Sequence, residues 1–294
     1  MELSIPNLSD YDLGKIILIS LGEAEEYVDA LPEEKVIEAT TYSSMQQIDS
    51  YFKRDNDNNS IELSKYEFLN EIFTLDALSI APSLRYISNP SYIEYPRDGY
   101  VKITTYAYKK HPYYALPGRD YFTIVGRADW VKSPVNKETD ILAIASSGNV
   151  DNNYPSCGAI IQSGECAICH ENVTITKTAY LNDESSQLYV YNPSIYGLAV
   201  ESDIGATNLI AGDNHGIAGV NNNGIPRSFV AYYGISTQED VSSQVGYSHK
   251  TIGLGKPTVS ASSSGALGFS IGIAGSKSDY LGRSFTLYYG QQYK

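Results

Sequence analysis

The 294-residue chain lacks the features that mark several protein classes. It has 24 Gly and 12 Pro, far too few for a collagen-like or low-complexity chain. Charged residues are only 19% of the chain and hydrophobic residues are 42%, which excludes a disordered polymer. No apolar run approaches the roughly 20 residues that span a bilayer. The composition therefore indicates a folded protein without a spanning helix.

Basic residues are scarce in the first quarter of the chain. Residues 1–80 hold 17 Asp and Glu against 5 Lys and Arg, a net charge of −12, and the remaining 17 acids and 16 bases leave −1. An acidic surface repels nucleic-acid phosphates and anionic headgroups, so we expect no nucleic-acid partner and no membrane partner. Two interpretations of the charge stay open: a solvated helical face, or a docking surface for a basic partner.

The first residues, Met1–Pro6, carry neither the basic segment nor the apolar core of a secretory signal. Only three Cys are present in the whole chain. Both observations fit synthesis in the cytoplasm, where thiols stay reduced.

Residues 1–88 show the apolar spacing of helices. Ser9 or Asp10 can cap a first helix, whose apolar residues run from Leu13 to Leu21 at intervals of three or four. We therefore expect an acidic helical region here.

Two further helix starts follow in the same region. Pro32 is followed by two Glu residues, as in a first helical turn, and apolar residues continue the predicted helix through Phe52. Four Ser and Thr residues between 40 and 44 have low helix propensity and weaken this helix prediction. Ser64 and Glu67 match a capping box and predict a third helix.

From about Tyr92 onward the apolar period changes to two, which is the period of strands. Turn-forming clusters rich in Gly, Pro, Asn and Asp separate the alternating segments, and no helical segment lies between them. This rhythm predicts antiparallel strands in a sandwich or barrel. The alternating segments are 100–108, 121–125, 173–180, 188–191 and 229–233.

The expected fold class is therefore α+β, an N-terminal helical region followed by a mainly antiparallel β domain. The expected domains are 1–88, acidic and helical, and 89–294, rich in Tyr and Gly, with a possible subdivision near 192–197.

Tyrosine is unusually frequent, with 26 Tyr against 7 Phe and 1 Trp. Tyr suits half-buried surfaces and is enriched at subunit interfaces, although strands of β-proteins also use it. The segment 266–274 alternates apolar residues with small ones, and predicts either a core strand or a strand that pairs with another subunit.

Cys166, Cys169 and His170 match the pattern of c-type haem attachment. We reject this interpretation because the attachment needs an exported protein. In addition, 158–161 and 166–169 read as two strands joined by a turn at 162–165. In an extended strand Cys166 and Cys169 point to opposite faces.

Zinc is the second interpretation of this segment, with Cys157, Cys166 and Cys169 as weak candidate ligands. The residues between Cys166 and Cys169 are Ala and Ile, which do not form the tight turn of a zinc knuckle. The favoured interpretation is three small, partly buried hydrophobic residues.

The segment from Asp55 resembles a calcium loop of the EF-hand type, with Asp55, Asp57 and Asn59 as weak candidate ligands. Ser60 stands where the loop needs Gly, and Glu67 lies one position late for the last ligand. A polar loop between two helices is the favoured interpretation. No cofactor is expected.

Catalytic motifs are weak. No Gly-x-Ser-x-Gly nucleophile motif is present, and the four His are scattered over expected loops. A carboxylate pair for sugar hydrolysis stays open, since acids on β loops could converge. These acids are Asp129, Asp151, Asp183, Glu184 and Asp213. We expect that the protein is not an enzyme.

The features together favour a non-enzymatic structural subunit of a large assembly, in particular a bacteriophage virion protein. Capsid auxiliary or decoration proteins, head fibres and neck or tail components are the candidates, and the expected partners are other copies of the chain and other virion proteins. Two alternatives stay open. One is a carbohydrate- or receptor-binding β module, and the other is a β-pore-forming toxin with its hairpin at 260–273.

Overall fold

The computed structural model describes residues 8–21, 23, 25–29, 31–55, 59–80, 100–130, 139–148, 151, 156–165, 172–181, 188–194, 196–203, 225–249, 258–260, 270–272 and 279–291. Within them the protein is mostly antiparallel β-sheet with a few short helices, which confirms the expected β-rich character. The helical elements are α1 (Asp10–Ser20), α2 (Glu25–Asp29), α3 (Glu33–Glu38), α4 (Lys65–Ile80), and the 3-10 turns η1 (Ala39–Thr41) and η4 (Pro112–Tyr114).

Seven strands form the larger sheet. They are β1 (Tyr42–Arg54), β2 (Ser60–Leu63), β3 (Val101–Lys110), β4 (Asp120–Trp130), β6 (Cys157–Glu165), β7 (Asn172–Tyr180) and β10 (Ile225–Thr237). Their order is β2-β1-β3-β4-β10-β6-β7, and every neighbouring pair is antiparallel.

The second sheet contains six strands. They are β5 (Thr139–Ser146), β8 (Leu188–Ser194), β9 (Gly197–Asp203), β11 (Val241–His249), β14 (Asp279–Leu281) and β15 (Phe285–Leu287). The order is β14-β11-β5-β9-β8, and β15 also pairs with β11. A separate pair joins β12 (Thr258–Ser260) to β13 (Ser270–Gly272).

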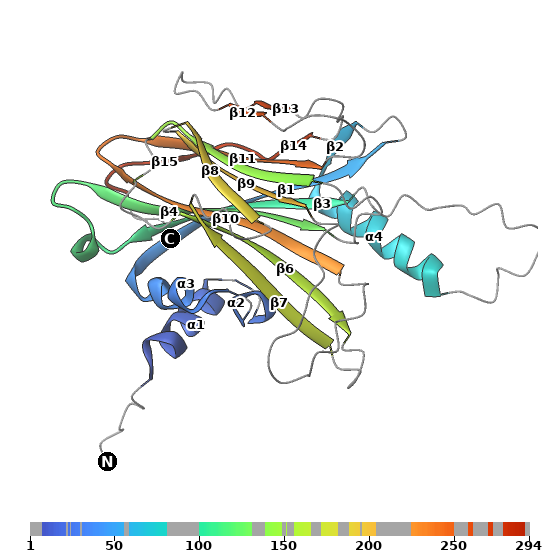
Figure 1. Cartoon of the computed structure of the whole chain (residues 1–294), viewed down its shortest axis with the longest axis horizontal. Helices are drawn as coiled ribbons and strands as arrows, with labels where there is room; N and C mark the ends of the chain where they lie inside the picture. Colours follow the sequence, from blue (N-terminus) through green and yellow to red (C-terminus); the bar gives the residue numbers. More distant parts are fainter. Residues whose placement is uncertain are drawn as a thin grey trace, which may run out of the picture.

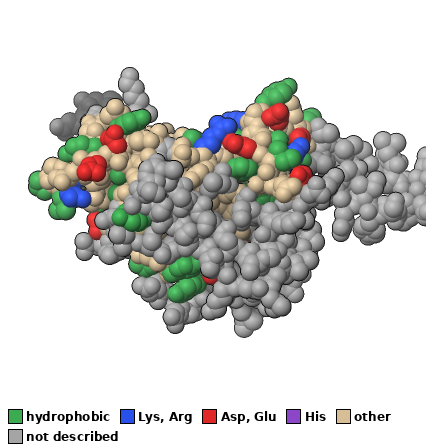
Figure 2. All heavy atoms as spheres, turned by 90° about the horizontal axis from the view of Figure 1, so that it is seen from above, with side chains coloured by type: hydrophobic (Ala, Val, Ile, Leu, Met, Phe, Trp, Pro, Cys, Tyr) green, Lys and Arg blue, Asp and Glu red, His purple; other side chains and the backbone are tan. Residues whose placement is uncertain are grey.

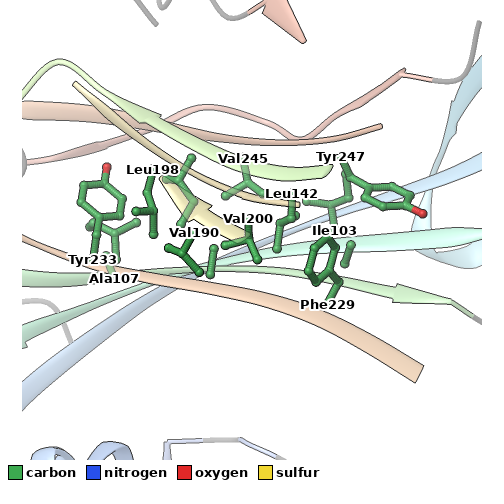
Figure 3. Close-up of a cluster of buried hydrophobic side chains, with 14 of the residues drawn as sticks. Ile103, Ala107, Leu142, Val190, Leu198, Val200, Phe229, Tyr233, Val245 and Tyr247 are labelled. Carbon is green, nitrogen blue, oxygen red and sulfur yellow. The ribbon is translucent and has the colours of Figure 1, made fainter. Parts of the chain in front are cut away.

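The two sheets pack against each other through one hydrophobic cluster (Figure 3). The larger sheet contributes side chains from β3 and β10, and the smaller sheet contributes side chains from β5, β8, β9 and β11. The labelled members are Ile103, Ala107, Phe229, Tyr233, Leu142, Val190, Leu198, Val200, Val245 and Tyr247. At β6 the sheets approach so closely that a Cβ added to Gly158 would lie 2.4 Å from Cγ1 of Val200.

The other face of the larger sheet carries α1, α2 and α3, which we call the helical cap (Figure 1). Leu18 and Val36 of the cap pack against Tyr106 and Tyr108 of β3 and Tyr232 of β10. The central strands of the larger sheet are therefore buried on both faces.

The cap itself depends on a close crossing of α1 and α3. Gly14 of α1 faces the backbone of α3, where an added Cβ would lie 1.9 Å from the carbonyl oxygen of Val36. Ser9 caps α1 as expected, with its side chain accepting a hydrogen bond from the Asp12 amide.

The expected helix from Pro32 through Phe52 is wrong beyond residue 38. The helix starts at Glu33 as expected and ends at Glu38, and residues Tyr42–Arg54 form β1. Met45 of β1 packs on the cap side, while Phe52 lies in the core between the sheets. Because both faces of β1 meet apolar neighbours, its apolar residues do not alternate, and their spacing imitates a helix.

Three other expectations have different outcomes. The capping box at α4 is confirmed: the Ser64 hydroxyl accepts from the Glu67 amide at 3.2 Å, and Glu67 accepts from the Ser64 amide at 2.8 Å. The expected turn at 162–165 is wrong, because β6 continues to Glu165, which pairs with Asn172. Of the expected strand 266–274, only β13 lies within the described residues.

Replacement of Gly14 by Ala tests the α1–α3 crossing. Ala normally favours a helix interior over Gly by about 0.5–1 kcal/mol. Here the added methyl group collides with backbone, so we expect Gly14→Ala to lower the free energy of unfolding by about 1–3 kcal/mol, as for overpacked cores. Urea denaturation would measure it. Ser20→Ala on the exposed side of α1 is the control, and an equal or higher stability of Gly14→Ala would contradict the crossing.

Candidate functional site

The described tyrosines differ widely in exposure, so their number alone does not define an interface. Seven described tyrosines are buried in the core: Tyr51, Tyr106, Tyr108, Tyr232, Tyr233, Tyr247 and Tyr280. Another seven are more than 40% exposed: Tyr66, Tyr113, Tyr114, Tyr180, Tyr189, Tyr288 and Tyr289. The exposed rings are the ones available to a partner.

Four of the exposed rings belong to two segments that share hydrogen bonds. We call Tyr113, Tyr114, Leu116, Tyr288 and Tyr289 the tip surface. The first three belong to the connection between β3 and β4, and the last two follow β15. Figure 2 shows hydrophobic side chains exposed at the end of the molecule where Figure 1 places the β3–β4 connection.

Local sequence explains the shape of the β3–β4 connection. The ring of His111 caps η4, with Nδ1 accepting from the Tyr113 amide at 3.2 Å, and Pro112 fixes the first turn. Gly118 has a φ of 73°, in the left-handed region that glycine tolerates best. The rings of Tyr113 and Tyr114 meet edge to face, with centroids 5.2 Å apart.

Hydrogen bonds join the β3–β4 connection to the chain segment after β15, and this segment to the residue before β11. The Tyr289 hydroxyl donates to the carbonyl oxygen of Gly118 at 2.9 Å, and the Tyr289 amide donates to Asp240 at 2.8 Å. Asp240 precedes β11, so three connections that are distant in sequence meet here. These bonds hold the Tyr289 ring and the backbone of the connections in position, which lowers the entropy lost when this surface binds.

A buried lysine ties this segment to the larger sheet. The Lys109 ammonium donates to Asp120 Oδ2 at 2.8 Å and to the carbonyl oxygen of Gln291 at 2.6 Å. The amide of Gly290 donates to the same Asp120 oxygen at 2.6 Å. Lys109 is only 5% exposed, so its charge depends on these partners.

The tip surface can bury large, rigid, polar-tipped rings against a partner. Tyr113 is 83% exposed, Leu116 is 63% exposed and Tyr114 is 54% exposed. Tyr anchors of this kind contribute disproportionately to the affinity of protein contacts.

Charge also distinguishes the tip surface from the helical cap. The three connecting segments 111–120, 238–240 and 288–291 hold one Arg against three Asp and Glu, a net charge of −2. Residues 8–41 hold nine Asp and Glu against two Lys, a net charge of −7. Two copies of this acidic chain repel each other less if they meet at the tip than if they meet at the cap.

A second group of polar residues lies between the cap and the larger sheet. Glu23 is 5% exposed and accepts a hydrogen bond from the Tyr108 hydroxyl at 2.6 Å. Nη1 of Arg127 lies 3.7 Å from the other Glu23 oxygen, and its Nε donates to Asp129 at 2.6 Å. The Ser228 hydroxyl donates to the same Asp129 carboxylate.

Burial raises the pKa of the Glu23 carboxyl above its ordinary value of 4.5, while the Tyr108 hydrogen bond and the Arg127 charge oppose the shift. A raised carboxyl pKa is also a mark of catalytic acids. Here the carboxyl is 5% exposed and bonds to groups of the larger sheet, Tyr108 of β3 and Arg127 of β4. The group therefore holds the cap on the sheet.

The candidate calcium ligands lie in a different setting from the one expected. Asp55 and Asn59 connect two strands, β1 and β2, so the expected loop between helices is wrong. The Asp55 carboxylate accepts from the amide and the side chain of Asn59, at 2.8 and 3.1 Å. These bonds tighten the hairpin. Asp57 lies outside the described residues.

Of the candidate zinc ligands, the structure places only Cys157, in β6. Its side chain is fully buried, and burial raises the pKa of the thiol to about 11, so it is protonated at neutral pH and a poor ligand. Cys166, Cys169 and His170 lie outside the described residues. Across the ranges that the structure describes, no group of three or more His, Cys, Asp or Glu could hold a metal ion.

The open carboxylate pair is not formed by the acids that the structure places. Asp129 lies near one end of β4, whereas Asp151 is bonded through its amide to Gly234, which pairs with Thr123 near the other end. Six residues of strand separate Thr123 from Asp129, about 20 Å. Asp183, Glu184 and Asp213 lie outside the described residues.

No family model matches this chain, and no curated protein sequence matches it. None of the described helices is long and apolar enough to cross a membrane.

The tip surface was not predicted from the sequence. Both halves contain a Tyr-Tyr pair, but so does the core at Tyr232 and Tyr233. No sequence signal separates an exposed pair from a buried one here.

The pH dependence of stability tests the assignment of Glu23. Because its pKa is raised in the folded state, its contribution to stability is full below about 4.5 and is lost as pH rises through the folded pKa. Glu23→Gln keeps an oxygen for Tyr108 and carries no charge. We therefore expect its free energy of unfolding, relative to the original protein, to increase between pH 4 and pH 8 in urea titrations.

Glu67→Gln provides a control of opposite sign, because hydrogen bonds from Ser64 lower the pKa of Glu67. Its relative stability should fall over the same pH interval. Parallel pH profiles for Glu23→Gln and the original protein would contradict the buried, charge-disfavouring site.

Proposed function

We propose that the chain is a non-enzymatic structural subunit of a large assembly, in particular a bacteriophage virion protein, and that the tip surface contacts a second copy. Under this proposal the two sheets form a β-sandwich and the N-terminal helices form its cap. Capsid auxiliary or decoration proteins, head fibres and neck or tail components remain the candidate classes.

The observation that carries the proposal is the group of exposed tyrosines on chain connections that hydrogen bonds hold together. A protein that acts alone gains nothing from leaving Tyr113 and Tyr114 in solvent, whereas a subunit gains affinity from large rings presented on such a surface. A specific contact needs about 800 Å² from each partner. The tip surface would form its centre, and the polar residues around it would form the rim.

The second candidate function is a carbohydrate- or receptor-binding module. The exposed Tyr113 ring favours it, because aromatic faces of this kind can also pack against a sugar ring. A glycan array distinguishes the two: ligands that bind the original protein and not Tyr113→Ser would favour the module, and no binding to any glycan would count against it. For the pore-forming alternative, only Ser260 and 270–272 of the hairpin 260–273 lie within the described residues.

Oligomeric state tests the proposed contact. In Tyr113→Ser/Tyr114→Ser, the loss of both rings should raise the dissociation constant between copies at least about tenfold, measured by sedimentation velocity over a range of concentrations. Thermal unfolding should stay unchanged, because both rings are exposed.

Tyr66→Ser, on α4, is the matched control, since this ring is 76% exposed and lies outside the tip surface. Its association should equal that of the original protein. A chain that is monomeric at every concentration, or an unchanged dissociation constant in the double variant, would refute the contact.

A further inference from the structure

Helix α1 carries a second apolar face that no described element covers. Leu13, Ile16 and Ile19 follow one another at intervals of three, which places them along one side of the helix. We call them the α1 outer stripe. They are 41%, 51% and 38% exposed.

The fold does not require the α1 outer stripe. The helix is attached to the cap by its opposite face, where Gly14 and Leu18 are buried, and its start is capped by Ser9. An exposed apolar face of this kind costs solubility without adding stability, which is typical of a contact site.

The surroundings of the stripe are strongly acidic. Both lysines of residues 8–41 already have acidic neighbours: Lys15 lies 2.6 Å from Asp29 and 3.2 Å from Glu25, and Lys35 is buried 3.4 Å from Glu38. Asp10 and Asp12 lie exposed in the first turn of α1 itself. A molecule that approaches the stripe therefore meets these exposed acids, within a region whose net charge is −7.

This charge decides between the possible occupants. A second copy would bring two acidic caps together, and an anionic membrane surface would be repelled in the same way. A helix with one apolar face and flanking Lys or Arg matches both the apolar stripe and its acidic surroundings. Its apolar side chains can pack between those of α1 while its cations face the acids.

We propose that the α1 outer stripe binds a basic amphipathic helix of another protein. The contact is separate from the tip surface, with which it shares no residue, so either proposal can fail alone. It gives the acidic first quarter of the chain a role as a docking surface.

Helix α4 offers a matched control within the same chain. Tyr66, Leu69 and Phe73 also form an exposed apolar stripe on a helix. The charges around it are more balanced: residues 53–73 hold five Asp and Glu against three Lys and Arg. The α4 stripe is thus at least as exposed as the α1 outer stripe, and the charge around it differs.

The experiment uses the full chain and a fluorescein-labelled peptide of Leu and Lys at helical spacing, about 18 residues or five turns long. Fluorescence anisotropy should show binding that weakens as salt increases. Ile16→Ser and Leu13→Ser should each weaken it at least about tenfold, the effect of losing one buried aliphatic side chain, while Leu69→Ser leaves it unchanged. A peptide of Leu and Glu should not bind.

Three outcomes would overturn the proposal. Equal binding to Ile16→Ser and Leu13→Ser would show that the peptide binds elsewhere. Equal weakening by Leu69→Ser would show that any exposed stripe suffices. Self-association of the chain that Ile16→Ser abolishes would identify a second copy as the occupant. Because these side chains are exposed, circular dichroism should show that each variant is folded.

Discussion

Burial of the larger sheet on both faces is the constraint on which the rest of the structure depends. One face packs on the smaller sheet and the other carries the helical cap. A strand in this position buries side chains on both faces, and the cap brings the carboxyl of Glu23 to one of them. Tyrosine suits this face, since the ring of Tyr108 fills space under the cap while its hydroxyl donates to Glu23. This explains part of the high tyrosine content without any partner.

The same constraint decides which elements could be predicted from the sequence. Helix starts depend on local chemistry, so Ser9, Pro32 and Ser64 marked α1, α3 and α4 correctly. Strands that follow clear alternation, such as β3 and β7, were also found. The strand β1 was not, because it meets apolar neighbours on both sides and its pattern loses the period of two.

The surfaces are harder to predict than the strands, for a different reason. The tip surface joins the β3–β4 connection to Tyr288 and Tyr289, which are about 170 residues away and meet it only in the folded chain. The residues Leu13 and Ile16 of the α1 outer stripe stand in the sequence at the spacing of an apolar helix face, which does not tell which face of the helix is buried. Only the structure shows that the buried face of α1 is the opposite one, with Gly14 and Leu18.

The bonds of Lys109 have a consequence for the order of events during synthesis. This residue and Asp120 are made early, whereas the Gln291 carbonyl and the Gly290 amide that complete their hydrogen bonds are made about 170 residues later. A nascent chain can therefore build much of the larger sheet before these bonds are available. The contacts that hold the β3–β4 connection to the segment 288–291 form only after translation has passed β15.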